Sequence, residues 1–420
     1  MTTTANPPQS PEDSQGRSPA PKHGRMGTWT AALRYALDRP LTSYYLLIGA
    51  SVLLLTIGLI MVLSASSVYS YKVHDGDSYS VVKRQLIWVI IGLPCAWIAS
   101  RVSNQWVRRL AYPAFSISLL LLLLTAFVGV ERNGNTNWLG IGPFVIQPSE
   151  IAKLSLVIWA AHIYANKDRR LGNLHQIMVP VVPGMLLATG LVIFGKDLGT
   201  ALVLFAILIG MLWVVGAPMR FFVLVTSVLS VAVFALATTS PERFERITTF
   251  ADPFKDFHET GWQPAHGLFA VASGGIFGQG IGASQQKWGT LPEAHTDFIF
   301  AVLGEELGLV GTLLLVGLFL TIAFAALRVA RETKDPFVRD ASFGIVVWLL
   351  GQMIINVGMV LALLPVIGIP LPLVSYGGSS LLPSLAALGL LVGFARREPA
   401  AARALAQRRQ RRSAGLSARR

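Results

Sequence analysis

The sequence predicts an all-α, polytopic membrane protein with about ten transmembrane helices and both termini in the cytoplasm. Of its 420 residues, 53% are hydrophobic and 14% are charged, and the charged residues fall between long apolar runs. A run of about 20 apolar residues is long enough to cross a hydrocarbon core of about 30 Å. Such runs occur at 44–66, 85–100, 110–129, 150–165, 177–194, 198–215, 221–238, 297–327, 341–363 and 381–395. The segments between them are too short for a soluble domain of ordinary size.

The chain divides into three predicted parts. Residues 1–40 are polar, rich in Pro, Ser and Thr, and lack the apolar core of a signal peptide, so we expect a disordered cytoplasmic tail. Residues 41–396 are the predicted transmembrane domain, which includes a large extracytoplasmic loop at 239–296. Residues 397–420 are a basic cytoplasmic tail. Cys95 is the only cysteine, which excludes an intramolecular disulfide and a multi-cysteine metal site.

The positions of the basic residues predict the orientation of the bundle. If the N-terminus is cytoplasmic, the formal charge of +13 collects on the cytoplasmic side, which is the positive-inside pattern. Nucleic acid is therefore not expected as a partner, whereas the tail is expected to hold anionic membrane lipids at about 1 kcal/mol per basic residue. The basic residues on this side, besides the tail, are Arg101, Arg108, Arg109, Lys167, Arg169, Arg170, Arg220, Arg328, Arg331, Lys334 and Arg339.

The loop at 239–296 is the only predicted loop large enough to hold a site. Its many aromatic residues, from Phe244 to Trp288, favour short helices that lie on the membrane surface. Its glycines at 278, 280 and 282 fit either a backbone cradle for a phosphate or a flexible turn. No nucleotide-binding P-loop motif occurs in the chain, so chemistry driven by ATP is not expected.

Ionisable residues at membrane depth cost at least about 2.5–3.5 kcal/mol each on insertion scales, so each is a functional candidate. Glu150 and Lys153 share one face of the fourth apolar run, which fits either a structural ion pair or a substrate contact. Lys196 and Asp197 occupy the tight turn between the fifth and sixth runs, where solvation alone would also explain them.

Asp297 opens the eighth apolar run, and two further acids, Glu305 and Glu306, follow two turns deeper. An acidic residue at this point also fits a helix cap, although Thr296 would cap the helix at lower cost. Between Pro365 and Pro383, prolines and glycines prevent regular helix at partial membrane depth. Such backbone is tolerated only where protein or a water-filled cavity covers it, so this segment is predicted to line a cavity.

Five motifs, in this order along the chain, resemble the SEDS family (shape, elongation, division, sporulation) over roughly residues 44–396. They are Gln147-Pro-Ser-Glu-Ile-Ala-Lys153, Asp197-Leu-Gly-Thr200, Gly278-Gln-Gly-Ile-Gly282, Leu291-Pro-Glu-Ala-His-Thr-Asp-Phe-Ile-Phe300 with Gly304-Glu-Glu-Leu-Gly308, and Pro370-Leu-Pro-Leu-Val-Ser-Tyr-Gly-Gly-Ser-Ser380. The chain departs from the family at two positions, with Asn137 where Arg is frequent and Lys196 where Pro is frequent. Lys196 or Arg132 is a candidate to replace the missing charge.

The resemblance implies a bacterial peptidoglycan glycosyltransferase that polymerises lipid II on the outer face of the cytoplasmic membrane. The motifs are more similar to family members that act in division than to those that act in elongation. The implied partners are a class B penicillin-binding protein, which is a transpeptidase, and other proteins of the division septum, where the protein is expected to lie.

The resemblance carries the role of general base onto Asp297. Attack by the activated sugar hydroxyl would displace the lipid diphosphate with inversion, and Lys153, Lys196 or a divalent cation (Mg²⁺ or Mn²⁺) would neutralise that leaving group. No cofactor is otherwise expected, and no protein metal ligands are predicted. The residues expected to bind substrate are Glu150, Lys153, Lys196, Asp197, Gln279, Glu293, His295, Ser375, Gly377, Gly378 and Ser379.

Two other classes of function compete with this interpretation. A flippase or transporter for lipid II would also place charged residues in the bundle, but the chain shows no convincing internal repeat and its polar groups collect on one side. A scaffold that recruits a partner enzyme would leave Asp297 and Glu305 without a role. Within the family, the polymerase of elongation is the remaining alternative.

Overall fold

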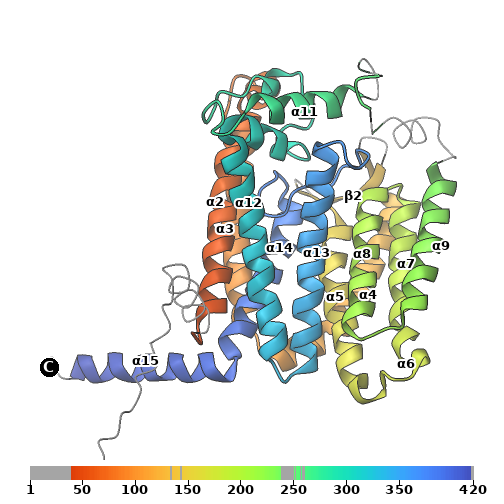
Figure 1. Ribbon diagram of the computed structural model, residues 1–420, viewed down its shortest axis with the longest axis vertical. Helices are drawn as coiled ribbons and strands as arrows, with labels where there is room; N and C mark the ends of the chain where they lie inside the picture. The colour runs from red at the N-terminus through yellow and green to blue at the C-terminus, as the bar shows by residue number, and fades with distance from the viewer. Residues whose placement is uncertain are drawn as a thin grey trace, which may run out of the picture.

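The computed structural model describes residues 39–132, 135–141, 144–237, 250, 252–255, 257 and 261–417. Ten long helices of this part coincide with the ten predicted apolar runs and lie side by side in a bundle (Figure 1). They are α2 (Thr42–Val73), α3 (Ser80–Arg101), α4 (Asn104–Val128), α5 (Pro148–Lys167), α7 (Val181–Phe194), α8 (Leu198–Val214), α9 (Met219–Ala237), α12 (Ile299–Glu332), α13 (Pro336–Val360) and α14 (Gly378–Arg397). The predicted fold class, an all-α polytopic membrane protein, is confirmed.

Seven helical segments of the described chain are long and apolar enough to span a bilayer. They are α2, α3, α4, α12, α13, α14 and the segment Leu174–Phe194, in which the short helix α6 (Leu174–Met178) leads into α7. Helix α8 is apolar but shorter. A 3-10 turn, η1 (Asp168–Arg170), connects α5 toward α6.

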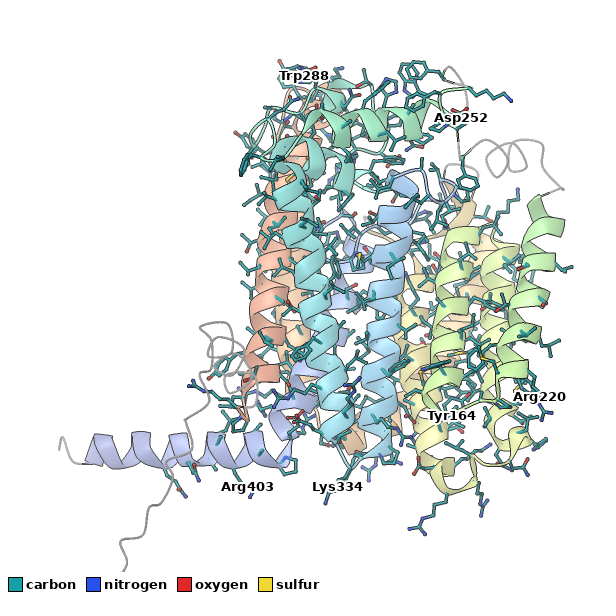
Figure 2. All side chains as sticks on the ribbon, in the orientation of Figure 1. Tyr164, Arg220, Asp252, Trp288, Lys334 and Arg403 are labelled. Carbon is teal, nitrogen blue, oxygen red and sulfur yellow. The ribbon has the colours of Figure 1, made fainter. Side chains whose placement is uncertain are left out.

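The two ends of the bundle differ in charge, as the sequence pattern predicts. We call the end that carries α11 (Trp262–Ser273) the outer end, and the opposite end the inner end (Figure 1). Arg220, Lys334 and Arg403 lie at the inner end, whereas Trp288 and Asp252 lie at the outer end (Figure 2). The predicted N-terminal tail lies almost wholly outside the described residues, and the C-terminal tail contains a helix, α15 (Pro399–Ser417), that lies crosswise at the inner end.

The bundle core depends on close approaches between helices. Helix α14 packs along α3, α12 packs against α2 and α13, and α4 packs against α5. At Gly389 of α14, an added Cβ would clash with the carbonyl oxygen of Ala96 in α3. Such small residues let membrane helices approach closely enough for dense van der Waals packing.

A small sheet, which the sequence did not predict, joins α4 to α5 at the outer end. Strands β1 (Val130–Arg132), β2 (Asn135–Ile141) and β3 (Phe144–Ile146) pair antiparallel in the order β1-β2-β3. Strands β1 and β3 have three residues each, which is too short to show an alternating pattern in the sequence. The backbone N–H of Thr136 donates to the carbonyl of Gly195 (3.1 Å), which ties the sheet to the turn before α8.

Helix α12 is broken at Gly308, and the large outer loop completes its backbone hydrogen bonds. Gly308 has a φ of +65°. The N–H groups of Leu309 and Val310 donate to Gly275 and Ile276. Because a helix break leaves backbone groups without partners, this pairing allows the break to be buried. The loop also contains α11 and the 3-10 turn η2 (Gln286–Trp288), whereas Phe244 and its neighbours lie outside the described residues.

Candidate active site

Asp297 lies in a tight turn immediately before α12. Glu293 begins the turn with a φ of +53°, and its carbonyl accepts hydrogen bonds from the N–H groups of Thr296 (3.2 Å) and Phe298 (3.1 Å). Helix α12 begins after Phe298, and no side chain caps its N-terminus. Helix capping therefore does not explain Asp297.

The non-helical segment 361–377 packs against this turn. The Ser375 hydroxyl donates to the carbonyl of Thr296 (2.6 Å) and the N–H of Tyr376 donates to the carbonyl of His295 (3.0 Å). The ring of His295 stacks on Tyr69 of α2, with 4.9 Å between centroids. Two predicted residues, His295 and Ser375, thus hold the turn in place from both sides.

The carboxylate of Asp297 is half-buried and unpaired. Its main-chain carbonyl accepts from Asn356 Nδ2 of α13 (2.7 Å). A Cβ added to Gly368 would lie 3.4 Å from Asp297 Oδ2, so this segment borders the carboxylate directly. Within the described residues, the Asp297 carboxylate forms no ion pair and accepts no hydrogen bond.

This environment raises the pKa of Asp297 to about 7, first through burial and then through the negative charges of Glu293 and Asp197. Burial also lowers the pKa of His295, which favours its neutral form. A carboxylate with a pKa near neutrality binds a proton more strongly than an exposed aspartate does. It is therefore suited to accept a proton from a substrate hydroxyl.

Asp197 and Lys196 lie at the start of α8, where their roles differ. Asp197 caps the helix, because its Oδ1 accepts from the N–H of Thr200 (2.9 Å). Its Oδ2 accepts from Asn137 (2.7 Å), Gln147 (3.0 Å) and the Thr200 hydroxyl (2.8 Å). Asn137, at the position where the family often has Arg, therefore binds Asp197 as a neutral donor. Lys196 is exposed, with a φ of +64°.

The start of α14 connects the residues around Asp197 to the segment 361–377. The Ser379 hydroxyl accepts from the N–H of Gln147 (3.2 Å), and the N–H of Gly377 donates to Gln85 Oε1 of α3 (3.2 Å). Gly378 packs on the indole of Trp88, which leaves no room for a Cβ. Gly377, Gly378 and Ser379 thus join three helices at the outer end.

Glu150 and Lys153 form a buried ion pair of 2.7 Å within α5. Lys153 Nζ also donates to Gln352 Oε1 of α13 (3.2 Å), which in turn accepts from Trp348 Nε1 (2.8 Å). The ammonium group is therefore already occupied, which favours the structural interpretation of this pair over a phosphate contact.

The glycine-rich segment and the acids of α12 form a separate cluster. The N–H groups of Gln279 and Gly280 donate to the carbonyls of Glu305 (2.9 Å) and Glu306 (3.0 Å). The Gln279 side chain donates to the carbonyl of Ser273 (3.2 Å). Because these donors already have partners in the chain, the geometry favours the turn over the phosphate cradle, and Gln279 has its contacts away from the turn at 293–298.

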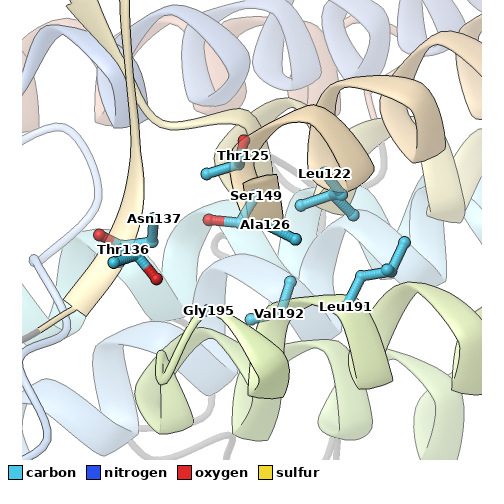
Figure 3. Close-up of a pocket in the computed structure, with 9 residues that line it drawn as sticks. All are labelled: Leu122, Thr125, Ala126, Thr136, Asn137, Ser149, Leu191, Val192 and Gly195. Atoms are coloured by element: carbon cyan, nitrogen blue, oxygen red, sulfur yellow. The ribbon is translucent and has the colours of Figure 1, made fainter. Parts of the chain in front are cut away.

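A small pocket lies between β2, α4 and α7 (Figure 3). Its volume of about 10 Å³ is room for a single water molecule. Two lining atoms, Asn137 Oδ1 and Ser149 Oγ, are buried without a hydrogen-bond partner in the described chain. The pocket is therefore suited to a water molecule and is too small for a sugar.

Sequence reasoning missed Asn356, Gln352 and Gln85, all amides within helices that contact the site segments. None of the three is ionisable, so the rule that charged side chains at membrane depth are functional does not identify them. Uncharged amides spaced four residues apart inside an apolar run, such as Gln352 and Asn356, were a usable signal, because an amide buried in a bundle needs a partner.

The chain matches a known protein family and named relatives. The cell cycle protein family FtsW/RodA/SpoVE matches residues 44–399. The chain is 39% identical over 397 residues to the probable peptidoglycan glycosyltransferase FtsW of Mycobacterium tuberculosis, covering 94% of this chain and 74% of that protein.

Two solved structures share the fold. One is described as the structural coordination of polymerization and crosslinking by a peptidoglycan synthase complex, with a TM-score of 0.68, 29% identity, and coverage of 84% of this chain and 97% of that chain. The other is the rod shape determining protein RodA of Thermus thermophilus, with a TM-score of 0.62, 30% identity and the same coverage. The chain thus belongs to the FtsW/RodA/SpoVE family of cell cycle proteins, which confirms the SEDS resemblance seen in its motifs.

Proposed function

We propose that the protein is a peptidoglycan glycosyltransferase that polymerises lipid II into glycan strands at the outer face of the cytoplasmic membrane. The observation that carries this proposal is the unpaired, half-buried carboxylate of Asp297 at the outer end of the bundle, in the turn 293–298 and beside the segment 361–377. The family and its relatives support the same activity.

Asp297 acts as the general base in this proposal. Its carboxylate accepts the proton of the acceptor sugar hydroxyl while that oxygen attacks the anomeric carbon of the donor. The bond between the anomeric carbon and the diphosphate oxygen breaks, so the configuration inverts and the lipid diphosphate leaves. A single carboxylate is sufficient, because the diphosphate needs neutralisation more than protonation.

Lys196 is the better candidate for that neutralisation, because it is exposed at the turn beside Asp197, whereas Lys153 is buried and paired. The described residues contain no group of three His, Cys, Asp or Glu side chains arranged to hold a metal ion. A divalent cation would therefore be bound mainly by the phosphate oxygens of the substrate, and its contribution is measured by adding EDTA and restoring Mg²⁺ or Mn²⁺.

We further propose that the protein acts in cell division at the septum, together with a class B penicillin-binding protein. The name of the mycobacterial relative supports the division role. The solved complex that coordinates polymerization with crosslinking supports a transpeptidase partner. A fluorescent fusion that localises along the side wall instead of the septum would favour the elongation role.

The decisive test uses purified protein with labelled lipid II, alone and with the candidate transpeptidase, and resolves the products on a gel. Wild-type protein is expected to form glycan strands, and Asp297→Asn to form none. Asp77→Asn is the matched control and should retain activity, because Asp77 is an exposed acid at the same end whose carboxylate pairs with Lys83 and accepts from the N–H of Tyr79. Strand formation by Asp297→Asn at the wild-type rate would refute the role of Asp297.

The same preparations distinguish a polymerase from a flippase. A flippase would move the lipid II headgroup across liposome membranes without any growth of glycan strands. Translocation without polymerisation, under conditions where a known polymerase is active, would refute the polymerase function and favour a flippase.

A further inference from the structure

The segment 361–377 has no helix or strand of its own, yet it borders Asp297. Pro365, Pro370 and Pro372 prevent it from forming helix, so its carbonyl groups need partners from elsewhere. At membrane depth an unsatisfied carbonyl is costly. The partners are supplied by side chains of α13.

Two amides, one helical turn apart on α13, bind two consecutive carbonyls of this segment. Asn356 Nδ2 donates to Ile369 (2.7 Å), and Gln352 Nε2 donates to Pro370 (3.0 Å). Both amide side chains are buried. The segment is therefore held against one face of α13 at adjacent positions.

Asn356 makes a second contact that Gln352 does not make. The same Nδ2 donates to the main-chain carbonyl of Asp297 (2.7 Å), so both of its protons are used. Because Gly368 precedes Ile369 and borders Asp297 Oδ2, a single amide sets the position of the carboxylate and of the wall beside it.

The cost of this amide argues against a purely packing role. Asn356 is completely buried, and its Oδ1 has no hydrogen-bond partner in the described chain. An apolar residue of similar size would avoid the penalty for that acceptor. What only the amide provides is the pair of donated hydrogen bonds.

We propose that Asn356 is a positioning residue, which holds the main chain of Asp297 and the 361–377 segment at the spacing that the reaction needs. The inference rests on the proposed function, because it assumes that Asp297 is the base. It extends that function by assigning the geometry of the base to a neutral residue of a different helix.

The test measures kcat and KM for lipid II polymerisation by Asn356→Leu and Asn356→Asp. A displacement of about 1 Å in a reacting group costs about 100-fold, so we expect kcat to fall by about that factor while KM changes little. For Asn356→Leu, the acid limb of the pH profile should also shift to lower pH, because a loosened turn lets water reach the carboxylate of Asp297. A residue that serves stability alone would change neither kcat of the folded fraction nor the pH profile.

Ser342→Ala is the matched control, because Ser342 is buried on the same helix and its hydroxyl has no partner among the described residues. If Asn356→Leu fails to fold, Asn356→Asp decides, since it keeps the shape of the side chain and loses at least one donor. Wild-type kcat and pH profile in the folded variant would overturn the inference. In that case an inactive Asp297→Asn would leave the proposed function intact, whereas inactivity of the wild-type protein would refute the function itself.

Discussion

Two acidic sites lie within ten residues of each other at the outer end of the bundle, and their surroundings differ. Glu305 accepts from the Ser284 hydroxyl (2.5 Å) and the N–H of Gln285 (2.9 Å). Glu306 forms an ion pair with the buried Lys287 (3.1 Å). Asp297 is half-buried, and its carboxylate has no such partner in the described chain.

The difference shows that burial of an acid does not by itself indicate catalysis. Glu305 and Glu306 anchor the outer loop to α12. Neutral donors stabilise the carboxylate of Glu305, and the ion pair with Lys287 compensates the charge of Glu306. The charge of Asp297 is uncompensated, so the folded protein bears its cost. Such a cost is expected where a group must remain free to react.

The largest expected effect on stability comes from breaking the ion pair between Glu306 and Lys287. Glu306→Ala leaves the ammonium of Lys287 buried without its partner, which costs about 3–5 kcal/mol. The melting temperature in detergent should fall, and hydrogen exchange should increase across residues 274–289. Lys287→Met combined with Glu306→Met should recover most of the loss, because an apolar pair replaces the ion pair.

The exposed pair of Asp77 and Lys83 at the same end is the control, and Asp77→Ala should change the melting temperature little. Equal effects of Glu306→Ala and Asp77→Ala would show that the buried cluster does not anchor the loop.

Neutralising Asp297 should stabilise the folded protein, whereas Glu306→Ala should destabilise it. A folded-state pKa of about 7 lies above the ordinary aspartate value, so ionisation destabilises the folded protein as the pH rises between these values. Asp297→Asn should therefore be more stable than wild type at pH 8, by at most about 4 kcal/mol, and equally stable at pH 4. Thermal unfolding at both pH values measures this, and a variant less stable than wild type at pH 8 would contradict it.

The sequence predicts the helices of the fold better than its sheet and its helix break. Hydropathy and charge locate the ten helices, because a membrane requires continuous apolar runs and leaves basic residues on one side. The small sheet escaped prediction because strands as short as Val130–Arg132 carry little pattern. The break at Gly308 also escaped, because it depends on Gly275 and Ile276, distant in the sequence, which complete its backbone hydrogen bonds.

The site itself was predicted only in part. The family resemblance identified Asp297, but the residues alone did not separate it from Glu305, since both are acids near the start of one apolar run. Partners distant in sequence distinguish them, such as Ser284 for Glu305 and Asn356 for the main chain of Asp297. A sequence without aligned relatives does not reveal such pairs.

The pH dependence of activity tests whether the base is Asp297 and not Glu305. The base must be ionised, so activity should rise with pH, reach half its maximum near pH 7 and fall about tenfold for each unit below pH 6. Glu305→Gln should leave this midpoint unchanged. A midpoint near pH 4 would show that the carboxylate is solvated. The titratable groups around Asp297 are Glu293 and His295 of its own turn, Asp197 of α8, Tyr376 of the 361–377 segment and Tyr69 of α2.

Variants of Asp197 should give the smallest effect on stability. Asp197 is buried, and its carboxylate accepts hydrogen bonds from neutral donors only. Asp197→Ala removes the cap of α8 and should cost about 1 kcal/mol, whereas Asp197→Asn keeps the capping oxygen and should cost less. Both variants remove a negative charge that raises the pKa of Asp297, so both should move the midpoint of activity below pH 7. Measuring melting temperature and pH profile on the same preparations separates the cap from the charge. An unchanged midpoint in both variants would show that the base is tuned by its own turn and by burial alone.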